Sequence, residues 1–180
     1  TPMGGRLLRR WLNNPLRNIE TLEQRQNFIT QVIACDNSED LQQCLKPIGD
    51  MERILSRVAL KSARPRDLSR LCCSLNALPS IQTVLVSLDS AKARSLATDI
   101  SEFPSIVNLL GKAIVENPPV VIRDGGVIAE GYDEELDELR GLSQNAGQFL
   151  LDLETQERER TGLSTLKVGY NRVHGYYIEI

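Results

Sequence analysis

The chain has 180 residues, of which 41% are hydrophobic and 4% aromatic, and this balance is typical of helices packed on helices. Its net charge of −3 excludes a protein that binds nucleic acid through a basic excess over its whole surface, because phosphate neutralisation supplies most of the affinity of such binders. We therefore expect any contact with DNA to come from a local patch or from residues outside this segment.

The cysteines and the hydropathy pattern exclude further classes. No C-x-x-C pair occurs and only one histidine is present, so a zinc site is not expected. The sequence predicts that Cys35, Cys44, Cys72 and Cys73 are reduced core residues of a cytoplasmic protein. Neither a signal peptide nor an apolar run of about 18 residues is found, which predicts no membrane span. Both ends of the sequence resemble mid-protein segments, so we expect a longer parent protein.

Four helices are predicted in the first sixty residues, because apolar residues recur there at spacings of three and four. They begin at Arg6, Asn18, Ser38 and Asp50, and the last three of these residues can cap a helix. The residues expected to face the core are Leu7, Leu8, Trp11 and Leu12; Ile19, Leu22, Ile29 and Ile33; Leu41, Cys44 and Leu45; and Met51, Ile54, Leu55 and Val58.

The next segment predicts a long helix from Pro65 to Leu88 that is kinked at Pro79, with two shorter helices as the alternative. Residues 87–95 form a polar connector with some helical character. A further helix begins at Pro104 and carries Ile106, Leu109, Leu110 and Ile114 on its apolar side.

Two hairpins are predicted, one on each side of a long helix. In VVIRDGGVIAEG, short β-branched runs flank Asp124, Gly125 and Gly126, which tolerate the positive φ of a tight turn. At the end of the chain, apolar residues alternate on both sides of a turn formed by residues 171–175. This second hairpin would be marginal alone, so we expect it to belong to a larger sheet.

The long helix between them is predicted over residues 133–161, with Asp133 as its N-cap and Gly162 as its C-cap. At 1.5 Å per residue it would be roughly 40 Å long. Its apolar stripe consists of Leu136, Leu139, Leu142, Ala146, Phe149 and Leu153. The polar run TQERERT that follows is expected to stand in solvent, so that the helix forms a rigid rod with the second hairpin at its tip.

Two charged groups are interpreted as structural. The carboxylates Asp124, Glu130, Asp133, Glu134 and Glu135 suit a turn and a helix N-terminus, although an enzyme that uses carboxylates near Asp124 remains an alternative. The basic residues Arg53, Arg57, Lys61, Arg64, Arg66 and Arg70 could form a phosphate-binding strip. Their spacing of about four residues also fits a solvated helix face with internal salt bridges, and this is the favoured interpretation.

The most credible contact for nucleic acid is the second hairpin. Lys167, Asn171, Arg172 and His174 are polar residues that this hairpin would display, although such side chains commonly remain solvated on an exposed strand. We assign no catalytic residue, because the sequence contains neither a phosphate-binding loop of the G-x-x-x-x-G-K-[ST] type nor a G-x-S-x-G nucleophile motif.

Four blocks of the sequence are distinctive, and in order they are TPMGGRLLRRWLNNPLRN, GDMERILSRVALKSARPRDL, VIRDGGVIAEGYDEELDELR and ERERTGLSTLKVGYNRVHGYYIEI. Together these blocks resemble the MutS family of bacterial DNA mismatch-repair proteins. The resemblance implies a helical core and lever domain over residues 1–163 and the first strands of a truncated clamp domain over residues 164–180. The Phe-x-Glu element with which this family reads mismatches does not occur here.

The resemblance also implies a function for the full-length protein. Such proteins form homodimers, bind double-stranded DNA with mismatches, recruit MutL, and bind and hydrolyse ATP with Mg²⁺. For this segment it implies a structural lever between clamp and ATPase domain, with no catalysis and no cofactor of its own. Two alternatives remain open, which are an independent helical interaction scaffold and a non-specific duplex DNA-binding module.

Overall fold

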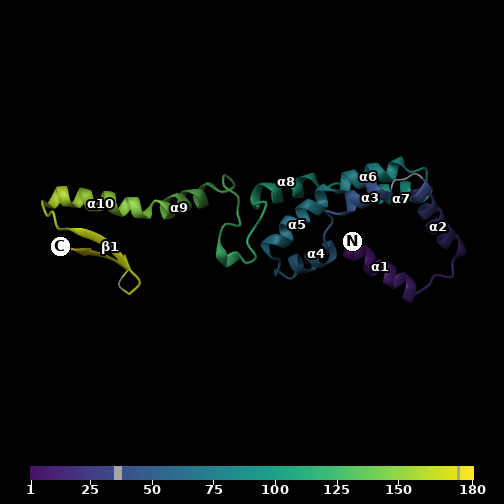
Figure 1. Cartoon of the computed structure of the whole chain (residues 1–180), viewed down its shortest axis with the longest axis horizontal. Coiled ribbons are helices and arrows are strands. Elements are labelled where there is room, and N and C mark those ends of the chain that lie inside the picture. The colour runs from purple at the N-terminus through teal and green to yellow at the C-terminus, as the bar shows by residue number, and fades with distance from the viewer. Residues whose placement is uncertain (35–37, 174) are drawn as a thin grey trace. The chain divides into compact units, whose positions relative to one another are not determined.

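The computed structural model describes residues 1–34, 38–173 and 175–180. It divides into two compact units, residues 1–129 and residues 130–180. Helices make up most of both units (Figure 1). The fold class is therefore mainly α, as the composition predicts, with a hairpin of two strands at the C-terminal end.

The first unit is built from short helices joined by short loops. In chain order they are α1 (Pro2–Asn13), α2 (Ile19–Ala34), α3 (Ser38–Leu45), α4 (Met51–Ala59), α5 (Pro65–Asn76), α6 (Leu78–Ser87), α7 (Ala91–Asp99), α8 (Pro104–Ala113) and the 3-10 turn η1 (Ile122–Asp124). Local chemistry accounts for their starts. Asn18 accepts a hydrogen bond from the backbone N–H of Thr21, and Asp50 and Ser90 accept equivalent bonds at the starts of α4 and α7.

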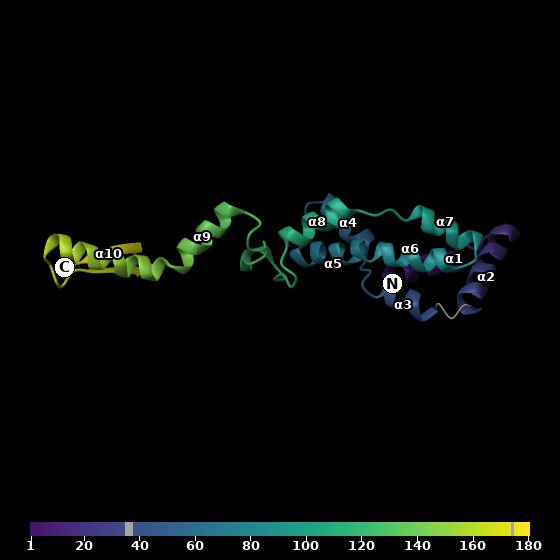
Figure 2. The ribbon, with the colours of Figure 1, turned by 90° about the horizontal axis from the view of Figure 1, so that it is seen from above.

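The core of the first unit lies around α6, which packs against α3, α5 and α7 (Figures 1 and 2). Its buried cluster consists of Ile48, Ile81, Leu85, Leu88, Ala93 and Ala97. The two alanines lie one turn apart on α7, and their small side chains let α7 approach α6 closely. Burying a residue such as Leu88 contributes about 1.5–3 kcal/mol, so this cluster contributes strongly to the stability of the unit.

The long helix expected from Pro65 to Leu88 is two helices, which was the alternative. The break falls at Ala77, and Pro79 is the second residue of α6. Within a continuous helix, Pro79 would lack a hydrogen bond and its ring would meet the carbonyl of Leu75. In the first turn of a new helix its missing N–H has no cost.

Several residues predicted to face the core are exposed instead. In α2, Ile19 and Ile33 are each 70% exposed, while Phe28 and Val32 pack against the core cluster. The helix carries two apolar stripes, and only the stripe of Phe28 and Val32 packs against the core cluster. The other predicted core residues that are exposed are Leu7, Leu8, Trp11, Leu12, Ile29, Leu45, Leu55, Val58, Ile106 and Leu109.

The first predicted hairpin does not form. Gly125 and Gly126 have the expected positive φ of 74° and 65°, but residues 122–124 before them form η1. The segment after them pairs with the end of α8 instead, where Val115 N–H donates to Val127 C=O over 3.1 Å and Ala129 N–H donates to Ala113 C=O over 2.9 Å.

The second unit contains α9 (Glu134–Gln144), α10 (Ala146–Thr161), β1 (Lys167–Asn171) and β2 (Gly175–Glu179). The predicted single rod over residues 133–161 is therefore wrong, because the helix is broken at Asn145, and the hairpin expected at its tip lies against α10 instead. Figure 2 shows α9 and α10 meeting at an angle. Asn145 is still bonded to both helices, since its N–H donates to Gly141 C=O and its C=O accepts from Phe149 N–H.

The predicted caps and the second hairpin are confirmed. Asp133 accepts a bond from Leu136 N–H at 2.9 Å, and Gly162 ends α10 in the left-handed conformation. Strands β1 and β2 are antiparallel, with Val168 opposite Ile178. Of the predicted stripe, Leu139 and Phe149 are exposed, and the side chains of Leu142 and Ala146 lie outside the described part of the chain.

Candidate nucleic-acid interface

The hairpin of the second unit lies alongside α10 and is joined to it by polar contacts (Figure 1). Glu154 of α10 accepts a hydrogen bond from Val168 N–H at 3.0 Å, and Arg158 donates from Nε to Leu166 C=O at 2.6 Å. The side chains of Glu154 and Arg158 also form an ion pair of 2.7 Å. We call these four residues the α10–β1 junction. It binds the start of β1 to the last turns of the helix.

Sequence reasoning missed this junction. Glu154 and Arg158 belong to or border the polar run expected to stand in solvent, yet both are half-buried. The spacing of four residues between an acid and an arginine was the available signal, but on a helix surface it predicts only a local pair. Leu166, which the same contacts hold, is buried at 4% exposure.

Apolar side chains complete the contact between helix and hairpin. Phe149, Leu150 and Leu153 of α10 and Val168, Tyr176, Tyr177 and Ile178 of the hairpin line a cavity of about 480 Å³. Tyr170 and Tyr176 are cross-strand partners whose ring centroids lie 5.0 Å apart, within the range that stabilises aromatic pairs. Gly169 lies opposite Tyr177, and a Cβ at this position would come within 2.8 Å of the tyrosine ring.

The predicted DNA-contacting residues are only partly brought together. Arg172 is exposed in the turn, next to Asn171, whose Oδ1 accepts a hydrogen bond from Val173 N–H at 3.0 Å. Lys167 is exposed at the opposite end of β1, across from Glu179. The length of β1 separates Lys167 from Asn171, a span of roughly 13 Å. His174 lies outside the described residues.

Within the predicted basic strip, the side chains of Arg53, Arg57 and Arg66 make contacts inside the protein. Arg57 binds both carboxylate oxygens of Asp67, at 2.7 and 2.9 Å, and Arg66 donates to Pro118 C=O at 3.1 Å. Burial raises the pKa of Asp67, but hydrogen bonds from Arg64 N–H and Arg57 outweigh it and hold this pKa below its ordinary value. These contacts agree with the structural interpretation of the basic strip.

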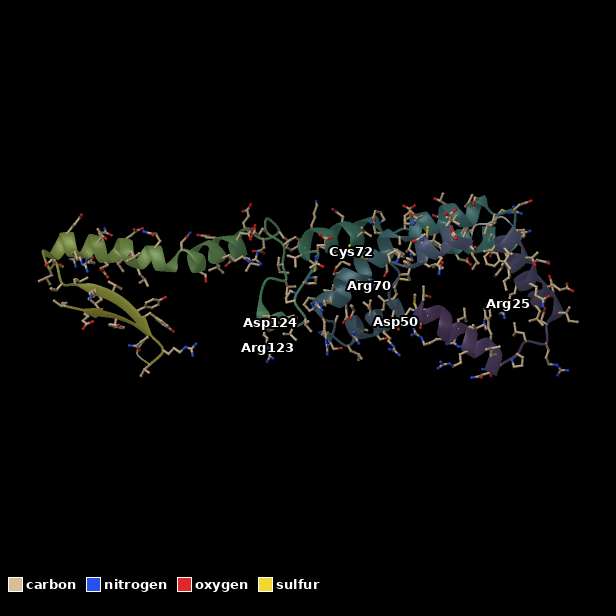
Figure 3. All side chains as sticks on the ribbon, viewed as in Figure 1. Arg25, Asp50, Arg70, Cys72, Arg123 and Asp124 are labelled. Carbon is tan, nitrogen blue, oxygen red and sulfur yellow. The ribbon has the colours of Figure 1, made fainter. Side chains whose placement is uncertain are left out.

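A second ion-pair group joins α1 to the start of α4, near Asp50 in Figure 3. Arg6 donates to both carboxylate oxygens of Asp50, at 2.7 and 2.6 Å, and also pairs with Glu52. The hydrogen bonds from Arg6 lower the pKa of Asp50 to about 2. The sequence identified Asp50 as a cap, but a partner 44 residues away leaves no local signal.

The carboxylates near the start of α9 also have structural partners. Asp133 caps the helix, and Asp137 accepts a hydrogen bond from Gly131 N–H at 2.6 Å. Gly131 has a φ of 79°, so this bond fixes the turn that leads into α9. Within residues 1–34, 38–173 and 175–180, no group of three or more His, Cys, Asp or Glu side chains is arranged to hold a metal ion.

The cysteines differ from one another in environment. Cys44 packs against the core cluster, and the thiol of Cys72 lies 3.6 Å from Val107 C=O, where burial raises its pKa. Cys73 was predicted to be a core residue but is exposed, because its side chain points away from the buried side of α5. Cys35 lies outside the described residues.

Among the helices that the structure describes, none is long and apolar enough to cross a membrane.

The fold and its contacts define a helical structural domain that carries a β-hairpin against its last helix. The family model of MutS domain III matches residues 1–165. The chain therefore belongs to the MutS family of DNA mismatch-repair proteins. The matched residues contain the first three of the four blocks that carry the resemblance and the start of the fourth.

Proposed function

We propose that this chain is the lever of a mismatch-repair ATPase, coupling a DNA clamp that continues from the hairpin to an ATPase domain elsewhere in the protein. The partners of the full-length protein are then mismatched double-stranded DNA, a second copy of itself and MutL, in the cytoplasm. ATP and Mg²⁺ would bind the ATPase domain, and these 180 residues would catalyse no reaction. On this proposal residues 1–163 belong to the lever domain and residues 164–180 begin the clamp.

The observation that carries the proposal is the α10–β1 junction. A lever requires that its tip move together with its shaft, because packed elements shift as units rather than deform smoothly. Glu154 and Arg158 bind the backbone at Val168 and Leu166. A displacement of the hairpin by DNA would therefore be passed to α10, which at 16 residues is about 24 Å long.

The break at Asn145 changes the mechanical picture from a single rod to two joined segments. Asn145 is hydrogen-bonded to Gly141 of α9 and to Phe149 of α10, so the two helices would remain connected through this residue. Bending at Asn145 would be easier than within either helix. We propose a lever with one joint, whose two helical arms are Glu134–Gln144 and Ala146–Thr161.

For the DNA contact we propose Arg172 and Lys167, with Asn171 shaping the turn between the strands; His174, the fourth residue predicted from the sequence, lies outside the described residues. Both cations are exposed and on the hairpin, where they could bind phosphates without reading base sequence. Tyr170 and Tyr176 lie on the face of the hairpin opposite to Lys167, which leaves the face that carries Lys167 and Asn171 for the polar contact.

The experiment uses the full-length protein that contains this chain. In the double variant Glu154→Gln/Arg158→Gln, the mismatch-dependent change in ATP hydrolysis should be at least about fivefold smaller than in the wild type. The affinity of this variant for matched duplex should change by less than about twofold.

The double variant Lys167→Ala/Arg172→Ala should instead weaken DNA binding, and the slope of log K against log salt should fall by about one for each phosphate that the variant no longer neutralises.

Glu159→Gln is the matched control, because Glu159 is exposed on the same helix. If the junction variant keeps full coupling while circular dichroism shows it folded, the lever proposal is wrong. The isolated chain should bind duplex DNA weakly at low salt. Tight and salt-sensitive binding by the isolated chain would favour the independent DNA-binding module instead.

A helical interaction scaffold is the second candidate function. The observation that favours it is the set of exposed apolar side chains on α1 and α2, because such patches on a folded protein mark contacts with other proteins.

A further inference from the structure

A cavity of about 410 Å³ lies in the first unit between α1, α2 and α7. Its apolar lining includes Leu7 and Trp11 of α1, Phe28 and Ile29 of α2, and Leu96 of α7. Phe28 and Leu96 also pack against the core cluster, so the floor of the cavity is fixed by the fold. Its volume and lining are those of a binding site rather than of a packing defect.

Two cations face this apolar space. The guanidinium of Arg25 lies 3.6 Å from the centroid of the Trp11 ring, and Lys92 of α7 lines the same cavity. Both residues are half-buried, and in the part of the chain that the structure describes neither forms an ion pair. No carboxylate is among the described residues that line the cavity. The Trp11 ring compensates Arg25 in part, but a carboxylate would form charge-assisted hydrogen bonds with both cations, so an anion placed here would be stabilised.

The apolar surface extends beyond the cavity. Leu8 and Leu12 of α1 and Ile33 of α2 are also exposed, so an occupant must cover more than the cavity itself. Helix α1 carries three arginines and no acidic residue, and one of them, Arg6, is compensated by Asp50. The lining of the cavity is therefore both apolar and positively charged, with Glu20 and Glu23 of α2 outside it, and this lining favours a macromolecular partner with apolar and acidic side chains.

We propose that the groove formed by α1, α2 and α7 docks an acidic amphipathic helix of a partner protein. Apolar side chains spaced at three and four residues enter the cavity against Trp11 and Phe28, and carboxylates beside them pair with Arg25 and Lys92. Charge complementarity selects this occupant over a basic or neutral helix. The area of exposed apolar surface selects a helix over a small carboxylate, which would fill the cavity but leave Leu8 and Leu12 in water.

Trp11 is the only tryptophan of the chain, so its fluorescence reports on this groove alone. The 180-residue chain is titrated with two tryptophan-free peptides of roughly 18 residues, long enough to be helical. They share the same Leu and Phe positions, but one carries Glu and the other Lys at the remaining positions. The acidic peptide should change Trp11 emission saturably, and the anisotropy of a labelled copy should give the same Kd. The basic peptide should produce neither change.

The variants test the role of the two cations. The double variant Arg25→Gln/Lys92→Gln should bind the acidic peptide about tenfold more weakly, because it loses two partly exposed ion pairs. Added salt should weaken binding to the wild-type chain more than binding to this variant. Arg94→Gln is the matched control, since Arg94 is exposed on α7 outside the cavity, and it should leave Kd unchanged. Circular dichroism establishes that each variant is folded.

If the groove has a different occupant, the same experiments give a different result. Equal binding of both peptides, or unchanged affinity in the double variant, would show non-specific apolar adhesion and overturn the proposal. Saturable binding of decanoate without binding of the acidic peptide would overturn it too and assign the cavity to small amphiphiles. Self-association in sedimentation experiments that the double variant abolishes would instead assign it to a second copy of the chain. None of these readouts involves DNA or ATP, so they are independent of the lever proposal.

Discussion

The carboxylate of Asp50 has two roles that are separable by mutation. It caps α4 by accepting a hydrogen bond from Arg53 N–H at 3.4 Å, and it binds Arg6 of α1 through both oxygens. The first role is local to α4, whereas the second joins two helices that are far apart in the sequence. Asparagine at position 50 would keep a cap acceptor but lose the charge.

The ion pair makes stability depend on pH in a defined direction. Arg6 lowers the pKa of Asp50 to about 2 in the folded protein, while the unfolded chain has the ordinary value of about 3.9. The unfolded state therefore binds the proton more readily, and the contribution of the pair is present above about pH 4 and is lost as the pH falls from about 4 through about 2. Asp50→Asn should lower Tm at about pH 7 and reduce the dependence of Tm on pH in that window, as measured by thermal unfolding from neutral pH down to about pH 2.

Asp89→Asn serves as the comparison for this measurement. Asp89 pairs with Arg94 at 3.2 Å, but both side chains are largely exposed, and such pairs contribute little. Its Tm profile should match the wild-type profile. A wild-type-like profile for Asp50→Asn as well would contradict a stabilising contact between α1 and α4.

At the scale of elements, the starts of several helices were predictable because capping is local, whereas α1 begins at Pro2 rather than at Arg6 and α7 begins within the segment predicted as a polar connector. Asn18, Asp50 and Asp133 each accept the hydrogen bond that their position in the sequence predicts. The face that a helix buries was less predictable. In α2, packing against the core cluster selected the stripe of Phe28 and Val32 over the stripe of Ile19, Ile29 and Ile33, and the sequence of α2 alone does not specify that choice.

Of the two predicted hairpins, the second forms and the first does not, because only the second has both pairing partners within one short segment. The pattern of β1 and β2 contains both partners within one short segment, so alternation and the turn determine the register. The segment at residues 127–129 pairs with residues 113–115, which lie outside the window that suggested a hairpin. For the candidate site, Lys167 and Arg172 were predictable as exposed strand and turn residues, whereas the roles of Glu154 and Arg158 depend on the fold-back of β1 onto α10.

The break between α9 and α10 gives a prediction at this scale. Asn145 has φ −91° and ψ 3°, outside the helical range, and asparagine is a weaker helix former than alanine by roughly 0.6 kcal/mol. Asn145→Ala should favour continuation of the helix and slow amide exchange across residues 141–149 by about threefold. Asn145→Gly should change exchange in the opposite direction. Hydrogen–deuterium exchange with mass spectrometry measures both, and equal exchange in the two variants would contradict an intrinsic joint at this residue.

At the scale of the molecule, burial is distributed unequally between the two units. The first unit holds the core cluster around α6. Of the residues in the second unit whose side chains the structure describes, Leu166 alone is fully buried. Because local stability follows burial, the second unit should open more readily than the first. This assigns a rigid base to residues 1–129 and a separately compliant arm to residues 130–180.

Two leucine-to-alanine variants, one in each unit, distinguish the local stabilities of the two units. Leu88→Ala removes a side chain that is 1% exposed and should destabilise the first unit by about 2–5 kcal/mol, with faster amide exchange throughout α5, α6 and α7. Leu166→Ala should speed exchange in β1 and in the last turns of α10 while leaving α5 to α7 unchanged, because the side chain belongs to the α10–β1 junction. Exchange measured peptide by peptide distinguishes the two patterns. If Leu166→Ala also reduces protection in α6, the two units unfold as one cooperative body, and the assignment of a rigid base and a separately compliant arm is wrong.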